Sequence, residues 1–221
     1  MIKIKETEVN GFKAAIRGMR NPMNSWDKSD SRYSCLCMDD KRDCPAEPYI
    51  VGPNDLALMK KLSKAGTDHA KFLRFITVTV DITAPMFWWF EYDTYKVGTV
   101  KNSCSKMHKI HIKPFLYDDF THEGIDEVST DYPELKRIFR NYIETIEELR
   151  LLFNKTQEKK YWRALIEMLP ESYNMRATVF INYQVLKTIY HARKNHKLDE
   201  WRDFCRWCET LPYFKEVCID A

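Results

Sequence analysis

Residues Ala84–Lys106 read APMFWWFEYDTYKVGTVKNSCSK, and the interpretation of the whole chain starts from this stretch. It follows a strand-like segment, begins with two adjacent tryptophans among other aromatic residues, and then turns polar. A polar run directly after an apolar strand and an aromatic helix start is typical of a pocket wall. The alternative is a helix that buries Phe87, Trp88 and Phe90, followed by a solvated basic loop.

The chain before this stretch alternates between strand-like and helical patterns. Residues 75–83, FITVTVDIT, have apolar side chains at every second position, which predicts a half-buried strand. Residues 1–9 alternate in the same way and predict an edge strand, and residues 11–19 fit a short helix. Asn21–Pro48 is rich in Asp, Ser, Asn and Pro and has no periodicity, so we expect a long loop there.

Apolar residues at helical spacing dominate the rest of the chain. Asn54 is expected to cap one helix, and Asp131 with Glu134 is expected to form a capping box before a long one. Residues 107–130 are irregular, with short strand character at Ile110 and Ile112. The helices are expected at residues 55–65, at 132–153, in a segment ending near 168, at 177–196 and at 198–210.

We therefore expect a single α+β domain over residues 1–221, with a mixed sheet, packed helices and a helical C-terminal half. At 221 residues the chain can bury about 70% of its unfolded surface. A hydrophobic fraction of 44% with 30% charged residues is typical of a globular protein. The net charge of +3 is too balanced to favour nucleic acid as a partner.

No apolar run reaches the roughly 20 residues that a membrane helix needs, so we expect no membrane span and a cytoplasmic protein. Seven cysteines without a secretion signal indicate reduced thiols. The candidate metal ligands are a cysteine cluster, a CxxC pair and two histidines three apart: Cys35, Cys37, Cys44, Cys205, Cys208, His108 and His111. Aromatic neighbours favour a buried helix face for the CxxC pair, so no metal site is expected.

Two blocks of the chain resemble the flavin-dependent thymidylate synthases. The first, ITVTVDITAPMFWWFEYDTYKVGTVKNSCSKM, is similar to that family's strand, helix and loop with the signature RHRxxSxNExSxRY, which here begins at Thr94. The second, LPESYNMRATVFINYQVLKTIYHARKNHKLDEW, is similar to the family's LP turn and NxR helix. In this block the asparagine is Asn182, and the arginine eleven residues beyond it is Arg193.

The resemblance implies a homotetramer that binds FAD between subunits. It implies reduction of the flavin by NADPH and transfer of a one-carbon unit from methylenetetrahydrofolate to C5 of dUMP, which the flavin hydride completes as a methyl group. Arg193 would lie beside the pyrimidine edge, where a fixed positive charge favours the ionised ring. Asn182 would hydrogen-bond the flavin, and Ser25 and His69 fall where the family has flavin-contacting residues. Asn182 and Arg193 also have simpler interpretations, as an exposed helix residue and as a partner of the helix dipole.

The signature itself departs from the family pattern. Lysine at a position of arginine keeps the charge but loses the two-pronged phosphate geometry. Glu91 stands at a nucleotide-contacting glutamine, and Gln184 stands at the NxR arginine. The replaced signature positions are Thr94, Tyr95 and Lys96 for RHR, Lys101 and Asn102 for NE, Cys104 for the later serine, and Lys106 and Met107 for RY.

Cys104 adds a separate hypothesis, because a thiol could attack pyrimidine C6 if Lys101 or Lys106 lowered its pKa. A small packing residue is the alternative. We expect a crevice bordered by Cys104, Asn182 and Arg193. The predicted site residues are catalytic Arg193 and Cys104, substrate-binding Glu91, Lys96 and Lys106, and cofactor-binding Ser25, His69, Asn102, Asn182 and Gln184.

Three hypotheses for function follow. The chain is an active flavin-dependent methyltransferase on a pyrimidine deoxynucleotide such as dUMP, with Lys96 and Lys106 in place of arginines at the phosphate. Alternatively, the same fold acts on another nucleotide or base, or the protein binds a nucleotide or assembles with partners without catalysis.

Overall fold

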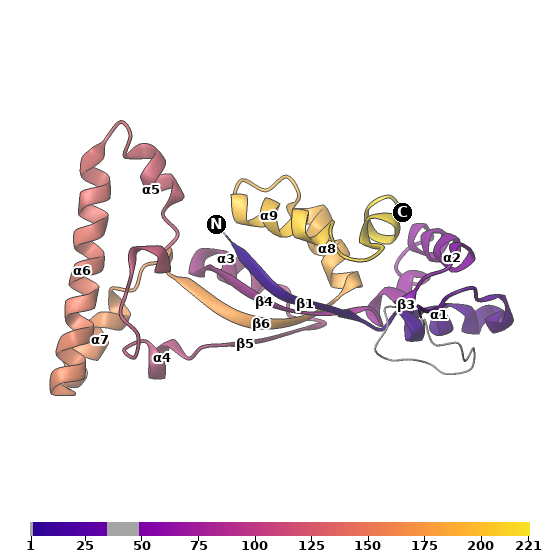
Figure 1. Cartoon of the computed structure of the whole chain (residues 1–221), viewed down its shortest axis with the longest axis horizontal. Helices are drawn as coiled ribbons and strands as arrows, with labels where there is room; N and C mark the ends of the chain where they lie inside the picture. Colours follow the sequence, from indigo (N-terminus) through magenta and orange to yellow (C-terminus); the bar gives the residue numbers. More distant parts are fainter. Residues whose placement is uncertain (1, 35–48) are drawn as a thin grey trace. The chain divides into compact units, whose positions relative to one another are not determined.

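The computed structural model describes residues 2–34 and 49–221 (Figure 1). Part of the predicted loop at Asn21–Pro48 therefore lies outside the described residues, together with Cys35, Cys37 and Cys44. The described part of this loop holds short 3-10 turns at Asn21–Met23 and Trp26–Lys28.

The chain divides into two compact units, which are described separately. The expectation of a single domain stays a prediction. The first unit consists of residues 1–5, 81–94 and 101–178, and the second of residues 6–80, 95–100 and 179–221.

A four-stranded sheet has the strand order β1-β4-β6-β5. The predicted strand at residues 75–83 is confirmed as β4 (Thr77–Pro85), and the edge strand at residues 1–9 is confirmed as β1 (Lys3–Asn10). Strand β5 (Thr99–Ser103) lies at the other edge, in the polar run where the alternative interpretation expected a loop. The observed strands and helices confirm the α+β fold class.

The predicted helix at residues 177–196 is wrong in its first part. Residues Asn174–Asn182 form strand β6, which lies between β4 and β5 in the sheet, and helix α8 (Tyr183–Arg193) follows. Buried side chains alternate with exposed ones along β6, and this period of two is that of a strand. The buried residues are Met175, Ala177, Val179 and Ile181.

In the first unit, the aromatic segment forms helix α3 (Met86–Tyr92). Trp88 and Trp89 are buried, and the Trp89 Nε1–H donates to the carbonyl of Met175 at 2.9 Å. Phe90, in contrast, is exposed, so the expectation that it is buried is wrong. The helix is therefore anchored to β6 through Trp89, and the buried Trp88 packs against Trp89 at a ring-centroid distance of 4.9 Å.

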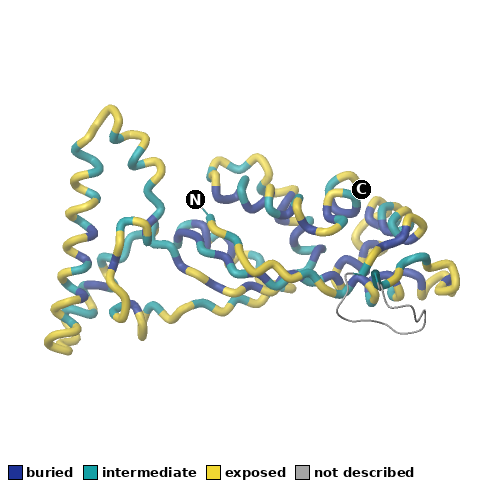
Figure 2. Tube along the Cα trace, viewed as in Figure 1, coloured by how far each residue is buried: buried dark blue, intermediate teal, exposed yellow. Residues whose placement is uncertain are grey.

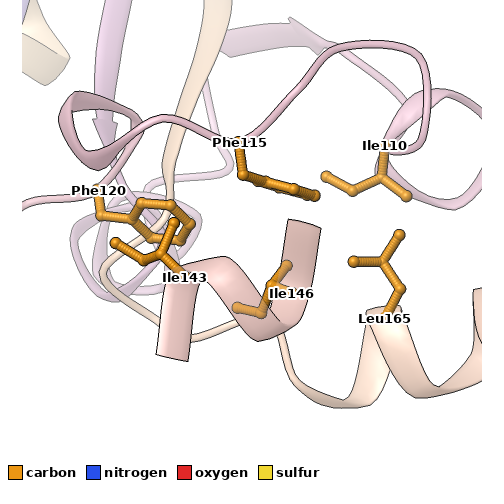
Figure 3. Close-up of a cluster of buried hydrophobic side chains, with 6 residues drawn as sticks. All are labelled: Ile110, Phe115, Phe120, Ile143, Ile146 and Leu165. Carbon is orange, nitrogen blue, oxygen red and sulfur yellow. The ribbon is translucent and has the colours of Figure 1, made fainter. Parts of the chain in front are cut away.

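The remaining helices of the first unit enclose a small core of their own. It comprises Ile110, Phe115, Phe120, Ile143, Ile146 and Leu165, drawn from α6, α7 and the segment before them (Figure 3). Most of α6 outside this core is half-buried or exposed (Figure 2). The bounds are α4 (Lys106–Lys109), α5 (Glu123–Val128), α6 (Pro133–Thr156) and α7 (Lys159–Glu167).

Two local predictions for this unit are wrong. The residue before α6 is Tyr132, without a side-chain cap, so Asp131 and Glu134 form no capping box. Glu134 instead pairs with Arg137 one turn later. Ile110 is the residue at which helix α4 ends, and it does not start a strand. Its side chain packs in the small core of this unit.

The second unit packs helices around an aromatic centre. Phe12 and Phe214 each meet the ring of Tyr183 edge-on, at centroid distances of 6.0 and 5.2 Å. Asn54 is not the cap of α2, since Gly52 precedes the helix and Pro53 occupies its first turn. The bounds are α1 (Phe12–Arg20), β2 (Arg32–Tyr33), β3 (Tyr49–Ile50), α2 (Pro53–Lys64), α9 (Asp199–Cys208) and a π-helical turn at Lys215–Ile219.

Among the helices of residues 2–34 and 49–221, none combines the length and the apolar character that a membrane span requires.

Candidate functional site

A cavity of about 660 Å³ lies in the first unit. Cys104 and Lys106 line it from the segment that follows β5, and residues 173–176 line it from the start of β6. Its volume falls within the range of roughly 300–1,000 Å³ that is typical of small-molecule sites. Two of the predicted site residues, Cys104 and Lys106, therefore share this cavity.

Three lysines, here called the cavity lysines, line it: Lys106 and Lys109 on α4, and Lys113 four residues further along. No carboxylate of the described residues forms an ion pair with any of them. Burial lowers the pKa of Lys106, and the charge of Lys101 lowers it further, with a smaller opposing effect of Asp93. The cavity lysines thus form no direct ion pair within the described residues, although one carboxylate, Asp119, lines the same cavity.

Lys101, the other lysine that could activate Cys104, is compensated within the fold. Its Nζ donates to Asp93 Oδ2 at 2.6 Å and lies 4.9 Å from the ring centroid of Trp89. Of the two lysines, only Lys106 lines the same cavity as Cys104.

The start of β6 supplies hydrogen-bond donors. Asn174 Oδ1 accepts from Thr121 Oγ1 at 2.8 Å, which leaves the two N–H groups on Nδ2 without a partner among the described residues. Arg176 is different, because its guanidinium pairs with Asp81, which also accepts from Thr178 Oγ1 at 2.5 Å. The hydrogen bonds from Thr178 and Arg176 lower the pKa of Asp81.

Apolar and aromatic side chains form another part of the cavity wall. Phe115 and Met175 are buried, and Tyr173 packs against Phe115 at a centroid distance of 5.9 Å. Burial raises the pKa of Tyr173 to about 12, with smaller contributions from the neighbouring Asp119 and Cys104. The tyrosine therefore stays a neutral hydroxyl beside the exposed thiol of Cys104.

The cavity thus combines three kinds of surface. Apolar side chains can hold a flat ring, the Asn174 amide can donate to the edge of a ring, and the cavity lysines can bind an anionic group. This set of contacts fits a small aromatic molecule that carries phosphate.

Arg193 occupies the last turn of α8 in the second unit, and aromatic side chains hold it there. Its Nε donates to Tyr95 Oη at 3.0 Å, and the guanidinium lies 4.8 Å from the ring centroid of Trp201, which is fully buried. The contact places a signature position, Tyr95, against the predicted catalytic arginine. The orientation of the guanidinium is therefore fixed by the fold.

Asn182 and Gln184 both lie at the start of α8. Asn182 is the N-cap, and its Oδ1 accepts from the Val185 N–H at 3.0 Å. Gln184 Oε1 is buried and has no hydrogen-bond partner among the described residues. Gly98 has φ +81°, and a Cβ there would lie 2.8 Å from Asn182 Nδ2, so the glycine is needed for this close approach.

Ser25 and His69 occupy different environments in the second unit. Ser25 is buried, and its carbonyl accepts from Arg20 Nη1 at 3.1 Å. Arg20 also donates from Nε to Asp55 at 2.6 Å, so Ser25 borders a buried ion pair. His69 is exposed, just before a 3-10 turn at Ala70–Arg74.

The other predicted site residues lie on or near the surface. Glu91 is on the last turn of α3, Lys96 is in the exposed turn before β5, and Asn102 is exposed on β5. Cys104 belongs to the first unit and Asn182 and Arg193 to the second, so the crevice bordered by all three stays a prediction.

Sequence reasoning missed most of the residues that line the cavity, among them Lys109, Lys113 and Asn174 and the apolar residues Phe115 and Met175. The two lysines follow Lys106 at spacings of three and four residues, and such a basic run signals an anion-binding surface. No local signal marks Asn174, because it reaches the cavity only through the position of β6 in the sheet.

The CxxC pair has the buried helix face that its aromatic neighbours indicate. Cys205 and Cys208 are both buried on α9, and burial raises the pKa of Cys205 to about 11. A thiol that resists ionisation is a weak nucleophile and a weak metal ligand. Across residues 2–34 and 49–221, no group of three or more His, Cys, Asp or Glu side chains could hold a metal ion.

Comparison with known proteins finds no match to a protein-family model or to a curated protein sequence. The fold, however, is similar to that of flavin-dependent thymidylate synthase ThyX from Helicobacter pylori. One crystal structure of that protein, complexed with FAD and dUMP, has a TM-score of 0.66 and 15% sequence identity, and the match covers 98% of this chain and 99% of that chain. A second structure with FAD and dUMP has a TM-score of 0.66 and 16% identity, covering 100% of this chain and 98% of that chain. The fold expected from the resemblance is thus confirmed.

Proposed function

We propose that this protein binds a pyrimidine nucleotide in the cavity of the first unit and uses FAD to methylate C5 of that nucleotide. The nucleotide proposed is dUMP, with methylenetetrahydrofolate as the one-carbon donor and NADPH as the reductant. The observation that carries the proposal is the full-length likeness to a fold crystallised with FAD and dUMP, in a chain whose cavity suits a phosphate-bearing ring.

Within the cavity, each surface has a proposed task. Lys106 binds the phosphate as a point charge, and the ligand's negative charge stabilises its protonated form, which burial disfavours. Phe115 and Met175 hold the pyrimidine ring by apolar contact, and Asn174 donates to a ring carbonyl. Together they would orient C5 of the base, which is the main task of a protein that works with a reactive cofactor.

Arg193 keeps its proposed role at the pyrimidine edge. Support comes from the way Tyr95 and Trp201 fix its guanidinium, because a preorganised charge needs no rearrangement when negative charge develops on the ring. Catalysis at this residue thus depends on a side chain that is also part of the packing.

The buried acceptor of Gln184 gives a test of fit for FAD. Gln184 Oε1 has no donor among the described residues, and the flavin ring presents an N–H group that could satisfy it. The bound flavin would supply the hydride. Asn182 would hold the same region through its Nδ2, while its Oδ1 caps α8. Ser25, His69 and Asn102 remain proposed flavin contacts.

A binding protein without catalysis is the second candidate function, and one observation favours it. Thr94, Tyr95 and Lys96 replace the Arg-His-Arg of the family signature, and the Tyr95 hydroxyl is engaged by Arg193 inside the protein. Several ligand contacts that the resemblance implies are thus lost or replaced by different side chains. Action on another nucleotide or base is the related alternative.

Absorption spectroscopy of the purified full chain separates these possibilities. We expect a flavin spectrum as isolated or after addition of FAD, and a shift of the flavin bands when dUMP is added. A chain that cannot be loaded with FAD would contradict both enzymatic proposals. Rescue of a thymidine-requiring strain then distinguishes methylation of dUMP from action on another nucleotide.

A further inference from the structure

Part of the cavity wall in the first unit has no regular backbone structure. Residues 112–116 all line the cavity, and residues 113–116 belong to no helix or strand. Because this segment lacks the backbone hydrogen bonds of a helix or a sheet, its position depends on the side chains that anchor it. Phe115 belongs to the segment, and its buried side chain is the proposed contact of the pyrimidine. The anchors of the segment therefore determine where that ring lies.

Helix α6 supplies anchors at both ends of this segment. The Phe115 N–H donates to Glu147 Oε2 at 2.9 Å. At the other end, the carbonyl of His111 accepts from Arg150 Nη1 at 3.1 Å and from Asn154 Nδ2 at 3.0 Å. The three anchoring residues are three and four positions apart on α6, which places them on one face of the helix. This face therefore holds the chain between His111 and Phe115.

The two charged anchors also hold each other. Arg150 Nε donates to Glu147 Oε2 at 2.7 Å, and Arg150 Nη2 donates to Glu147 Oε1 at 2.5 Å, so the guanidinium binds the carboxylate through two bonds. Arg150 is buried, and Glu147 is half-buried. Burial alone would raise the pKa of Glu147, but hydrogen bonds from Arg150 and from the Phe115 N–H lower it overall. The carboxylate is thus ionised and held in the orientation that accepts from Phe115.

The ion pair acts on the cavity without reaching it. Neither Glu147 nor Arg150 is among the described residues that line the cavity, so a ligand there does not contact them. For stability alone, apolar residues of similar volume often serve as well as a buried ion pair. Apolar residues cannot, however, accept a hydrogen bond from the backbone of the cavity wall. The contact with the Phe115 N–H therefore favours a role in shaping the site.

We propose that Glu147 and Arg150 are positioning residues of the nucleotide site. Glu147 holds the backbone of Phe115 so that its ring packs on the pyrimidine, and Arg150 holds both Glu147 and the His111 carbonyl. The inference rests on the proposed function, since it takes a pyrimidine nucleotide as the ligand and Phe115 as its contact. The affinity for the nucleotide then depends on a hydrogen bond that is made outside the cavity.

Two double variants isolate this hydrogen bond. Both contain Arg150→Met, so neither leaves a buried charge unpaired. The first adds Glu147→Gln, which keeps an oxygen that can accept from the Phe115 N–H. The second adds Glu147→Met, which has a similar length but no such oxygen. Calorimetric titration of the full chain with dUMP, in the presence of FAD and well below the melting temperature, should show about tenfold weaker binding to the second variant than to the first. Exchange of the Phe115 amide hydrogen, followed by NMR, should be faster in the second variant.

Two single variants complete the test. Glu147→Asp keeps the charge beside Arg150 but shortens the side chain by one methylene group, so it should also weaken dUMP binding. It takes the place of the second double variant if that variant does not fold, and unchanged affinity would then overturn the inference. Tyr142→Phe removes a different hydrogen bond of α6, to the Met168 carbonyl. This control should lower the melting temperature without changing the affinity for dUMP.

The outcomes separate the inference from the proposed function. Equal dUMP affinity in the two double variants, or equal exchange of the Phe115 amide, would overturn the inference while the proposed function stands. If Tyr142→Phe weakens dUMP binding as much as the second double variant does, a general loosening of α6 explains the effect and the inference is overturned. If the parent protein loaded with FAD does not bind dUMP, the proposed function fails and the inference fails with it.

Discussion

Two arginines of the second unit and the cavity lysines of the first unit hold their positive charge in different ways. In the second unit, Arg20 is buried against Asp55, and Arg193 packs against Tyr95 and Trp201. In the first unit, the three cavity lysines have no acidic partner among the described residues. A charge that the protein compensates holds the fold together, whereas a charge that it leaves uncompensated is open to a ligand. Arg193 tests this distinction, because it is both held by the fold and proposed to act in catalysis.

The largest effect on stability is expected at the buried Arg20–Asp55 ion pair. Asp55→Ala should lower the free energy of unfolding by about 3–5 kcal/mol, because it leaves the Arg20 guanidinium buried without its partner. It also removes the acceptor of the hydroxyl groups of Ser29 and Ser31, at 2.7 and 2.6 Å. Urea unfolding measures the loss. Asp81→Ala in the first unit, which breaks a pair with an exposed arginine, is the control and should cost less than about 1 kcal/mol. Equal losses in the two variants would contradict the distinction.

The same aspartate predicts a dependence on pH. Burial alone would raise the pKa of Asp55, but hydrogen bonds from Ser31, Ser29 and Arg20 lower it overall. The folded state then binds fewer protons than the unfolded state, so the contribution of Asp55 is fully present above its unfolded pKa of about 3.9. It is lost as the pH falls through the lowered pKa of the folded state. In Asp55→Asn, the loss of stability in this acid range should be smaller than in the parent protein.

Arg193→Ala sharpens the comparison at the residue with both roles. We expect the rate of dTMP formation to fall by about 10²–10³-fold, the usual effect of removing one preorganised charge or donor. Stability should fall by only about 1–2 kcal/mol, for the lost contacts with Trp201 and Tyr95. Turnover and thermal unfolding measure the two effects, with Arg206→Ala, an exposed arginine on α9, as control. A loss of several kcal/mol with unchanged turnover would assign Arg193 to structure alone.

Lys106→Met tests the role of a cavity lysine that has no acidic partner among the described residues. Affinity for the pyrimidine nucleotide should fall about tenfold, measured by titration calorimetry. The free energy of unfolding should stay the same or rise slightly, because burial and Lys101 disfavour the charge of Lys106 in the folded protein. Lys160→Met, an exposed lysine on α7, should leave binding unchanged. A clear loss of stability in Lys106→Met would show that the fold depends on this charge after all.

Cys104→Ser should have the smallest effect. The thiol is exposed, so stability should change by less than about 0.5 kcal/mol, and we expect turnover to remain close to that of the parent protein. Unchanged turnover would rule out attack of the thiol on pyrimidine C6 and leave the cavity lysines as the residues to study. A fall of a hundredfold or more with a normal melting temperature would instead support covalent attack.

The local sequence pattern was sufficient to predict a strand or helix wherever only one face of that element is buried. In strand β4, apolar residues alternate with polar ones because one face of the strand is buried. In α9, apolar residues recur at helical spacing because one side of the helix is buried. The sequence pattern predicts a helix over most of strand β6, because the apolar residues of this strand run directly into those of α8. Its place between β4 and β5 decides the strand, since hydrogen bonds to two neighbours complete its backbone.

The candidate site, like the fold, has features that the sequence predicts and features that only the tertiary structure decides. The sequence by itself determined the α+β class, the edge strand β1, the aromatic anchor in α3 and the presence of Cys104 and Lys106 beside each other, because these depend on residues close together in the chain. Only the tertiary structure decided that Asn174 lines the same cavity, that Arg193 is held by Tyr95 and Trp201, and that the cavity lysines have no acid partner among the described residues. Whether a charge is compensated depends on side chains brought together from distant segments, and the spacing of residues along the chain carries no record of that.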